Sequence, residues 1–182
     1  MTLQLLNTNR TDKNTAHSYL PLYDELLNTK KETAENVLEV GIYGGGSIEL
    51  WSKYFSKATI YGVDIENYKQ EWNLLKKYTN IKLLYNTNAY SEDTIQKIEN
   101  IKFDMVLDDG SHYLQDMIKF IKLYSPLLKD DGILIIEDVQ NIDWLDILTN
   151  NTPKDLQQYI KTFDLRENKK RYDDIVFTIL KS

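Results

Sequence analysis

The stretch VLEVGIYGGGSIELW, residues 37–51, determines the fold. It begins with apolar residues, passes Glu39 and Gly41, and then has three consecutive glycines at positions 44–46, followed by Ser47. Four of the seven glycines of the chain lie within six positions, and glycine costs backbone entropy on folding, so the cluster needs a local reason. A strand, a glycine-rich turn and a helix in this order let backbone N–H groups approach a ligand closely. We predict a strand over 36–40 and a helix over 47–55 with Ser47 as its N-cap, joined by a turn that either holds a ligand or only connects the two.

On either side of this stretch, strand-like and helix-like segments alternate. The strand-like segments are 36–40, 58–63, 81–85, 103–107, 132–136, 160–165 and 175–180, and the helix-like segments are 19–27, 47–55, 67–77, 91–99, 113–128 and 142–149. The runs IYGVDI, FDMVLDD and GILIIEDV are mostly apolar until they end in acids, as buried parallel strands are. The last strand follows the polar turn ENKKRYDD, which suits a hairpin. The pattern predicts an α/β fold: a Rossmann-like three-layer sandwich whose seven-stranded sheet is mainly parallel, with an antiparallel last strand.

The composition indicates one domain over residues 1–182, with residues 1–30 as an N-terminal helical cap segment. The chain has no cysteine, which excludes disulfides, zinc–thiolate sites and cysteine nucleophiles. Its net charge of −6 disfavours a nucleic-acid partner, because phosphate binding needs a basic face. No apolar run approaches the roughly 20 residues that span a bilayer, and the first residues lack the pattern of a secretory signal. We therefore expect a cytoplasmic protein with no membrane partner.

Polar residues follow five of the predicted strands, at the point where each strand ends. They are Glu39 with Gly41, then Asp64, then residues 86–89, then Asp108 with Asp109, then Glu137 with Asp138. The carboxyl ends of parallel strands form the usual ligand crevice, and an acid at the end of the second strand can accept both hydroxyls of a ribose. The glycine spacing satisfies neither the GxGxxG dinucleotide fingerprint nor the phosphate-binding P-loop.

The runs FDMVLDDGSHYLQDM and GILIIEDV contain a second group of acids. Neighbouring strands lie about 5 Å apart, so Asp109, Glu137 and Asp138 could converge on one point. Three carboxylates that close repel one another unless a cation neutralises them. Oxygen ligands favour Mg²⁺, with Mn²⁺ or Ca²⁺ as alternatives. The other interpretation is that these acids only cap the helices that follow them.

His112 is one of two histidines and follows the predicted metal ligand Asp109 by three positions. A lone histidine is usually structural or solvent-exposed. A histidine in the crevice beside a metal ligand is a candidate general base, because its neutral ring accepts a proton at physiological pH.

The first motif and the run IYGVDI resemble the first two motifs of class I S-adenosylmethionine-dependent methyltransferases. The resemblance implies that the glycine turn lies against the methionine and ribose of the cofactor, and that Asp64 holds the ribose hydroxyls. The segment after the third strand would lie near the adenine; the family often has an acid there, where this chain has asparagine. The implied cofactor residues are Glu39, Gly41, Tyr43, Gly44, Gly45, Ser47, Asp64, Ile65, Asn88, Ala89 and Asp108.

DDGSH together with IED resembles the metal-dependent O-methyltransferases of macrolide and rhamnosyl sugars, which are grouped with cephalosporin hydroxylase-like proteins. The resemblance implies that Asp109, Glu137 and Asp138 bind the magnesium and that His112 is the base. The segment TDKNTAHSYLPLYDELL is similar to one that precedes the fold in these enzymes, and it implies an acceptor-side role for His17 and Tyr19. The register also includes Asp12, Lys13 and Tyr23, and the resemblance covers about residues 11–139.

Together these features predict a Mg²⁺-dependent O-methyltransferase that acts on a hydroxyl of a glycan, glycoside or nucleotide-sugar, with His112 and Asp109 as catalytic residues. One alternative is a catechol-type enzyme, whose metal set usually includes an asparagine. A nicotinamide-dependent oxidoreductase is disfavoured by the glycine spacing. A non-catalytic nucleotide-binding module on the same fold is the third alternative, although it would not need to keep the acids and His112. A homo-oligomer is left open.

Overall fold

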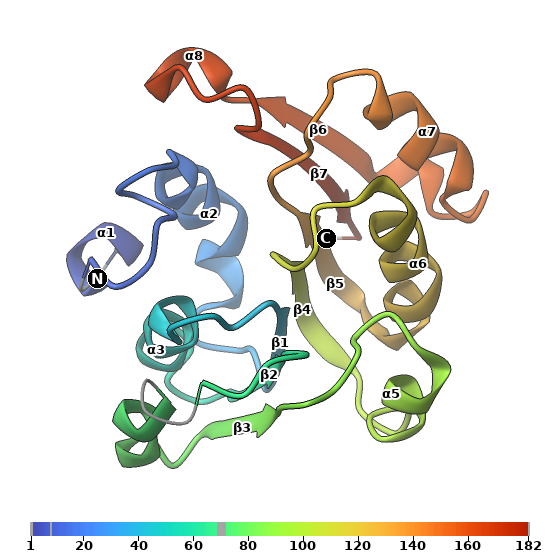
Figure 1. Ribbon diagram of the computed structural model, residues 1–182. Coiled ribbons are helices and arrows are strands. Elements are labelled where there is room, and N and C mark those ends of the chain that lie inside the picture. The colour runs from blue at the N-terminus through green and yellow to red at the C-terminus, as the bar shows by residue number, and fades with distance from the viewer. Residues whose placement is uncertain (1, 8, 69–71, 182) are drawn as a thin grey trace.

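A seven-stranded sheet forms the centre of the computed structural model, which describes residues 2–7, 9–68 and 72–181 (Figure 1). The strand order is β3-β2-β1-β4-β5-β7-β6. The strands are β1 (Asn36–Val40), β2 (Thr59–Val63), β3 (Ile81–Leu84), β4 (Phe103–Asp108), β5 (Leu128–Ile136), β6 (Ile160–Asp164) and β7 (Ile175–Leu180). Strands β1 to β5 pair in parallel, and β7 is antiparallel to both of its neighbours, β5 and β6. The predicted fold class is thereby confirmed.

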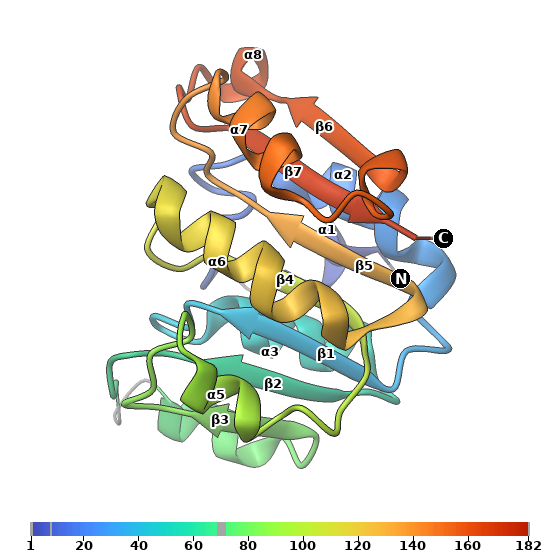
Figure 2. The ribbon, with the colours of Figure 1, turned by 90° about the vertical axis from the view of Figure 1, so that its right-hand side faces the viewer.

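Helices cover both faces of the sheet and make the three layers (Figures 1 and 2). On one face lie α1 (Leu3–Leu6), α2 (Tyr19–Leu27) and α3 (Gly46–Tyr54). On the other lie α5 (Glu92–Gln96), α6 (Leu114–Tyr124) and α7 (Trp144–Asn151). The short α8 (Arg166–Lys169) lies in the connection from β6 to β7, and 3₁₀ turns occupy Asn28–Lys30, Asn73–Lys77, Ser125–Leu127 and Gln157–Tyr159. Among the described residues no helix is long and apolar enough to span a bilayer.

Each face of the sheet has its own apolar core, because successive side chains of a strand point to opposite faces. In β1, Val37 packs with α2 and α3, whereas its neighbour Leu38 packs with α6. Both side chains are fully buried. The two cores fix the heights of the strands, and therefore fix which residues reach the carboxyl edge of the sheet.

The predicted elements agree with the structure in order and type, with a few differences in extent. The expected helix 67–77 is a 3₁₀ helix over Asn73–Lys77, and its residues 69–71 lie outside the described residues. The expected helix 113–128 ends at Tyr124, and Leu128 already belongs to β5. The prediction of Ser47 as N-cap is wrong: Gly45, in the left-handed region at φ +75°, is the N-cap, so α3 starts one residue earlier.

Candidate active site

The glycines of the β1–α3 turn serve three different structural needs. A Cβ on Gly41, whose φ is +84°, would lie 2.0 Å from the carbonyl oxygen of Asp109, so this glycine lets the turn pass against the end of β4. A Cβ on Gly46 would lie 2.1 Å from the carbonyl oxygen of Arg10, so the N-terminal segment crosses directly over the start of α3. Gly44 faces open space, with nothing within 4 Å of its Cβ position. The turn is therefore packed on two sides and open on a third.

Asp64 connects this turn to the end of β2. Its Oδ2 accepts hydrogen bonds from the backbone N–H of Ile42 at 2.7 Å and of Tyr43 at 3.1 Å, and its Oδ1 accepts one from Glu66 N–H at 2.8 Å. An ionised carboxylate has about four acceptor positions, and three are used here, so Asp64 can still accept from a ligand hydroxyl. The side chain thus shapes the turn and faces the space above it.

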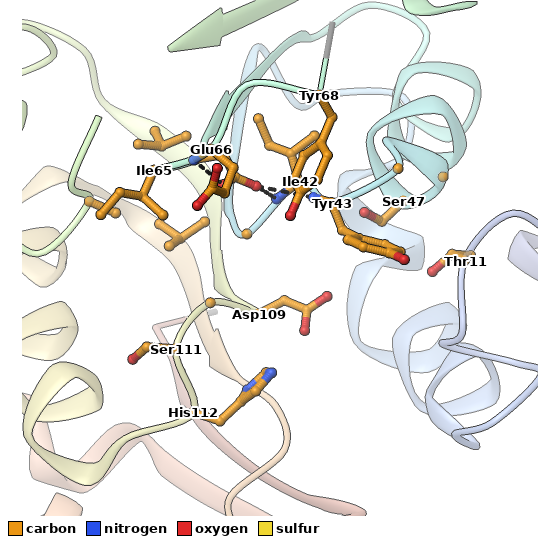
Figure 3. Close-up of a pocket in the computed structure, with 18 of the residues that line it drawn as sticks. Thr11, Ile42, Tyr43, Ser47, Ile65, Glu66, Tyr68, Asp109, Ser111 and His112 are labelled. Carbon is orange, nitrogen blue, oxygen red and sulfur yellow. Dashed lines mark hydrogen bonds between the residues drawn. The ribbon is translucent and has the colours of Figure 1, made fainter. Parts of the chain in front are cut away.

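That space is a cavity of about 800 Å³ at the carboxyl edge of the sheet (Figure 3). Its walls are the glycine turn, the end of β2, residues 88–90, residues 109–112 and part of the N-terminal segment. Eight of the predicted cofactor residues line it: Gly41, Tyr43, Gly44, Ser47, Asp64, Ile65, Asn88 and Ala89. Asp109 and His112 line the same cavity and point into it from the end of β4. Exposed Tyr43 and Ile65 provide apolar surface beside the carboxylates of Asp64 and Glu66.

Three predicted cofactor residues do not line the cavity. Gly45 packs against Leu75. Glu39 is fully buried: Trp51 Nε1 donates to its Oε2 at 3.0 Å, and its Oε1 lies 3.2 Å from Lys13 Nζ. Asp108 accepts from the hydroxyl of Tyr90 at 2.7 Å. Burial raises the pKa of Glu39 and of Asp108 to about 7 in each case. These two acids lie behind the wall and support it.

The predicted metal ligands divide into two groups, and His112, the predicted base, lies with one of them. Asp109, His112 and Asp138 each present an atom within 4.8 Å of the others, and His112 Nε2 lies 3.8 Å from Asp138 Oδ2. His112 and Asp138 both adopt left-handed backbone, at φ 57° and 56°, which is uncommon for residues other than glycine. Loops that turn sharply at the ends of β4 and β5 thus bring their side chains together.

Glu137 turns toward the protein interior instead. One of its carboxylate oxygens accepts from Lys13 Nζ and the other accepts from the hydroxyl of Tyr23. Burial, together with the nearby charges of Asp109 and Asp138, raises its pKa well above the ordinary value, although Lys13 opposes the rise. The three acids are neighbours as predicted, but Glu137 faces the N-terminal segment.

Lys13 is the main residue to which the sequence analysis assigned no role. Its side chain is fully buried, and its Nζ lies 2.6 Å from Asp109 Oδ2 and 3.2 Å from Glu39 Oε1, besides its contact with Glu137. Burial alone would lower its pKa, but the three carboxylates raise it well above the ordinary value, so the amine stays charged. The cation that the acid cluster requires is therefore partly supplied by the chain itself.

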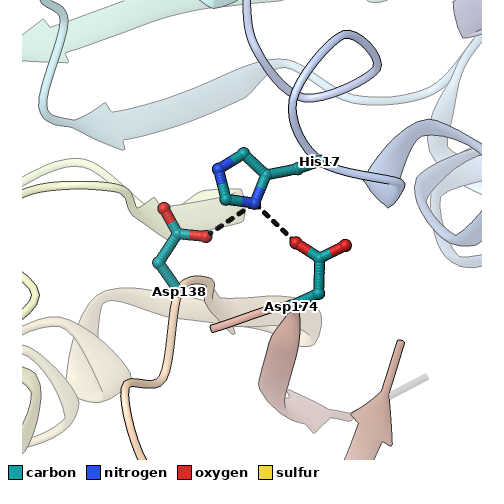
Figure 4. Close-up of side chains that lie close together, drawn as sticks. All are labelled: His17, Asp138 and Asp174. Carbon is teal, nitrogen blue, oxygen red and sulfur yellow. Dashed lines mark hydrogen bonds and ion pairs between the residues drawn. The ribbon is translucent and has the colours of Figure 1, made fainter. Parts of the chain in front are cut away.

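His17 and Tyr19, predicted to face the acceptor, are buried against Asp138. Figure 4 shows the His17 ring facing the carboxylates of Asp138 and Asp174. His17 Nδ1 lies 2.6 Å from Asp174 Oδ1 and 3.3 Å from Asp138 Oδ1. The hydroxyl of Tyr19 donates to Asp138, and the rings of His17 and Tyr19 stack with their centroids 5.0 Å apart. Neither side chain lines the cavity, and both contact Asp138 and so orient it.

The charges of this cluster favour a cation. Five carboxylates, those of Glu39, Asp109, Glu137, Asp138 and Asp174, share Lys13 and the His17 ring. Each carboxylate oxygen has two lone pairs, so Glu137 could bind an ion and keep its contacts with Lys13 and Tyr23. The donor set is rich in hard oxygen atoms, and it fits Mg²⁺.

Several residues that line the cavity were not predicted. They include Arg10, Thr11, Asp12, Glu66, Tyr68, Tyr90 and Ser111. Glu66 and Ser111 each lie close to a predicted residue, so a wider window around the strand ends would have included them. Arg10 donates to the carbonyl oxygen of Gly44 at 2.7 Å across 34 positions of sequence, a contact that no local pattern indicates.

A family model described as a methyltransferase domain, Methyltransf_24, matches residues 38–139. The 8-demethyl-8-alpha-L-rhamnosyl tetracenomycin-C 2'-O-methyltransferase of Streptomyces olivaceus is 29% identical over 140 residues, which cover 73% of this chain and 36% of that protein. The mycinamicin VI 2''-O-methyltransferase of Micromonospora griseorubida is 26% identical over 140 residues, covering 70% and 33% respectively. The chain thus spans about a third of the length of these O-methyltransferases.

Among solved structures, the MycE methyltransferase of the mycinamycin biosynthetic pathway superposes with a TM-score of 0.76 and 20% identity. The match covers 99% of this chain and 53% of the other, and that crystal contains Mg, SAH and mycinamycin VI. At this identity the likeness establishes a shared fold, which includes the N-terminal segment and the antiparallel end of the sheet.

Proposed function

This chain belongs to the methyltransferase domain family whose model it matches at residues 38–139, and we propose that it methylates a sugar hydroxyl with S-adenosylmethionine and Mg²⁺. The observation that carries the proposal is one continuous cavity. Asp64 and the glycine turn line one part of it, and Asp109 and His112 line another. A methyl donor and an acceptor hydroxyl must meet at one point, and residues of both sets line this one cavity.

The cofactor part of the proposal rests on the shape and chemistry of the cavity. Gly44 leaves room at its wall, Asp64 and Glu66 supply carboxylates for ribose hydroxyls, and Ile65 and Tyr43 supply apolar faces for a purine. A volume of about 800 Å³ lies within the usual range for a small-molecule site.

The metal part assigns Asp109, Glu137 and Asp138 as ligands of Mg²⁺. Its support is the excess of carboxylates over cations, and the opening of Asp109 to the cavity, where its side chain is 21% exposed. When bound, S-adenosylmethionine supplies an electrophilic methyl group, and Mg²⁺ orients a hydroxyl and lowers its pKa.

The chain's own residues then handle the proton and the geometry. His112 Nε2, 3.8 Å from Asp138, is placed to accept the proton of a hydroxyl in the cavity, because its side chain is one third exposed there. Asp138 stabilises the charge that the ring gains on protonation. Positioning two substrates in one closed space supplies much of the rate gain in reactions of this type.

The acceptor class is inferred from the relatives, whose names state rhamnosyl, olivosyl and mycinamicin acceptors. Asp109, His112 and Asp138 suit a sugar carrying two adjacent hydroxyls, since Mg²⁺ can hold a pair of neighbouring oxygens.

Calorimetry with S-adenosylhomocysteine, with NAD as the control ligand, tests the cofactor assignment. We expect S-adenosylhomocysteine to bind and NAD not to bind. Asp64→Ala should weaken the binding of S-adenosylhomocysteine by about 1–3 kcal/mol, because the ribose hydroxyls would lose a charged partner. A methyl-transfer assay on a panel of sugar glycosides, with and without chelator, tests the rest. Binding of NAD in place of S-adenosylhomocysteine would exclude the proposed function, and full turnover in excess chelator would exclude its metal.

A further inference from the structure

Lys13 has an unusual position for a lysine. Its amine makes contact with Asp109, Glu137 and Glu39, which come from three neighbouring strand ends. The side chain is fully buried, so no substrate can reach it. A lysine is almost never fully buried unless it is paired with an acid, and this one is paired with three.

The lysine approaches the acids from the side opposite the cavity. Residues 9–12 and Thr15 line the cavity, whereas the fully buried Lys13 does not. Asp109 therefore has Lys13 on its inner side and the cavity, with His112, on its outer side. A divalent cation bound from the cavity would share Asp109 and Glu137 with the lysine.

We propose that Lys13 is a built-in counter-cation of the metal site: it keeps Asp109 and Glu137 assembled before an ion binds, and it weakens the ion's binding by competing for their charge. This inference rests on the metal site of the proposed function. Lys13 is a positioning residue in this account, since it acts through the carboxylates.

Two effects of opposite sign follow from the proposal. Without the lysine, the buried acids repel one another, so the metal-free protein becomes less stable. The same acids then attract a divalent ion more strongly, because the positive charge of Lys13 no longer repels the ion beside the carboxylates that they would share. A purely structural lysine would behave otherwise: its loss would weaken folding and metal binding together.

The experiment measures Mn²⁺ binding by calorimetry, and thermal unfolding in chelator, on the full chain and on three variants. Lys13→Met should unfold at a lower temperature in chelator and bind Mn²⁺ about tenfold more tightly or better. Lys30→Met is the matched control: Lys30 is also buried and pairs with Asp131 at 2.7 Å, away from the site. It should lose stability without a change in Mn²⁺ affinity.

Lys13→Met combined with Glu39→Gln covers the case in which the single variant fails to fold. Glu39 is the acid on Lys13 that is not a proposed metal ligand, and glutamine at this position removes one acid from the cluster while it keeps an acceptor for Trp51. The double variant should recover part of the lost stability. Two outcomes overturn the proposed role of Lys13 and leave the metal site standing. One is unchanged or weaker Mn²⁺ binding by Lys13→Met, and the other is a double variant as unstable as the single one. No Mn²⁺ binding by any form overturns the metal site itself.

Discussion

Replacing Gly41 by alanine should destabilise the protein strongly, although it adds one methyl group. Two features of the site oppose that methyl group. The backbone of Gly41 lies at φ +84°, in the left-handed region, and the added Cβ would lie 2.0 Å from the carbonyl oxygen of Asp109 and 2.6 Å from its carbonyl carbon. Backbone atoms of a paired strand end cannot move aside as a flexible side chain can.

The magnitude can be built from these two features. The left-handed conformation costs an alanine about 1–2 kcal/mol. Overpacking of a closely packed site costs about 1–3 kcal/mol more. The sum, roughly 2–5 kcal/mol, is less than the roughly 5–15 kcal/mol by which domains are usually stable, so the variant should still fold. For a chain of this size it corresponds to a fall of the melting temperature by roughly 4–20 °C.

Urea denaturation followed by circular dichroism measures the effect, and Gly44→Ala is the control in the same turn. The Cβ of that variant would meet nothing within 4 Å, and its φ is not in the left-handed region, so its unfolding free energy should stay within about 0.5 kcal/mol of wild type. If both variants unfold at the wild-type urea concentration, the turn does not pack against Asp109 as described. If both are equally destabilised, the contact with Asp109 is not the cause.

Two further predictions concern the base and the stability at low pH. His112→Gln should lower turnover by about 10²–10⁴-fold, with the affinity for S-adenosylhomocysteine nearly unchanged. His17→Ala is the control and should have a smaller effect on turnover. Near-normal rates for His112→Gln would show that His112 is not the base. Burial would raise the pKa of Glu49, but hydrogen bonds from Tyr78, Lys53 and Arg10 outweigh it and lower the pKa from 4.5 to about 2. The stability that Glu49 contributes is therefore present above pH 4.5 and lost as the pH falls toward 2, so Glu49→Gln should flatten acid unfolding in that window; an unchanged acid transition would contradict this.

Local patterns were sufficient to predict the sheet and the edge where the site lies. An apolar run that ends in acids indicates where a buried strand ends. Because the strands are parallel, these ends lie at one edge of the sheet. Asp64, Asp109 and His112 follow from that reasoning, and all three line the cavity. The glycine turn was predicted either to hold a ligand or only to connect β1 and α3, and in the structure Gly44 leaves it open on one side.

What local patterns could not predict are contacts between segments far apart in the sequence. The contact of Lys13 with Glu137 joins residues 124 positions apart, and it decides which way that carboxylate faces. The wrong N-cap has a similar origin. Ser47 is a good capping residue by type, but Arg10 and Thr11 lie against Gly46, and the chain enters α3 through the left-handed Gly45 instead.

The acids of the cluster and most of the residues that contact them come from different parts of the chain. The acids Glu39, Asp109, Glu137 and Asp138 all lie within residues 38–139, the part that the family model matches. Most of their partners lie outside it: Lys13, His17, Tyr19 and Tyr23, all within eleven positions of the N-terminal segment. Trp51, which donates to Glu39, lies inside it. Three of these four acids are buried, and a buried charge without its partner costs about 3–5 kcal/mol. Residues 38–139 alone would therefore carry an uncompensated charge of several acids at the carboxyl edge of the sheet. The N-terminal segment is for this reason a component of the site, present before any ligand binds, and a description of it as a cover that only opens and closes would not account for its contacts.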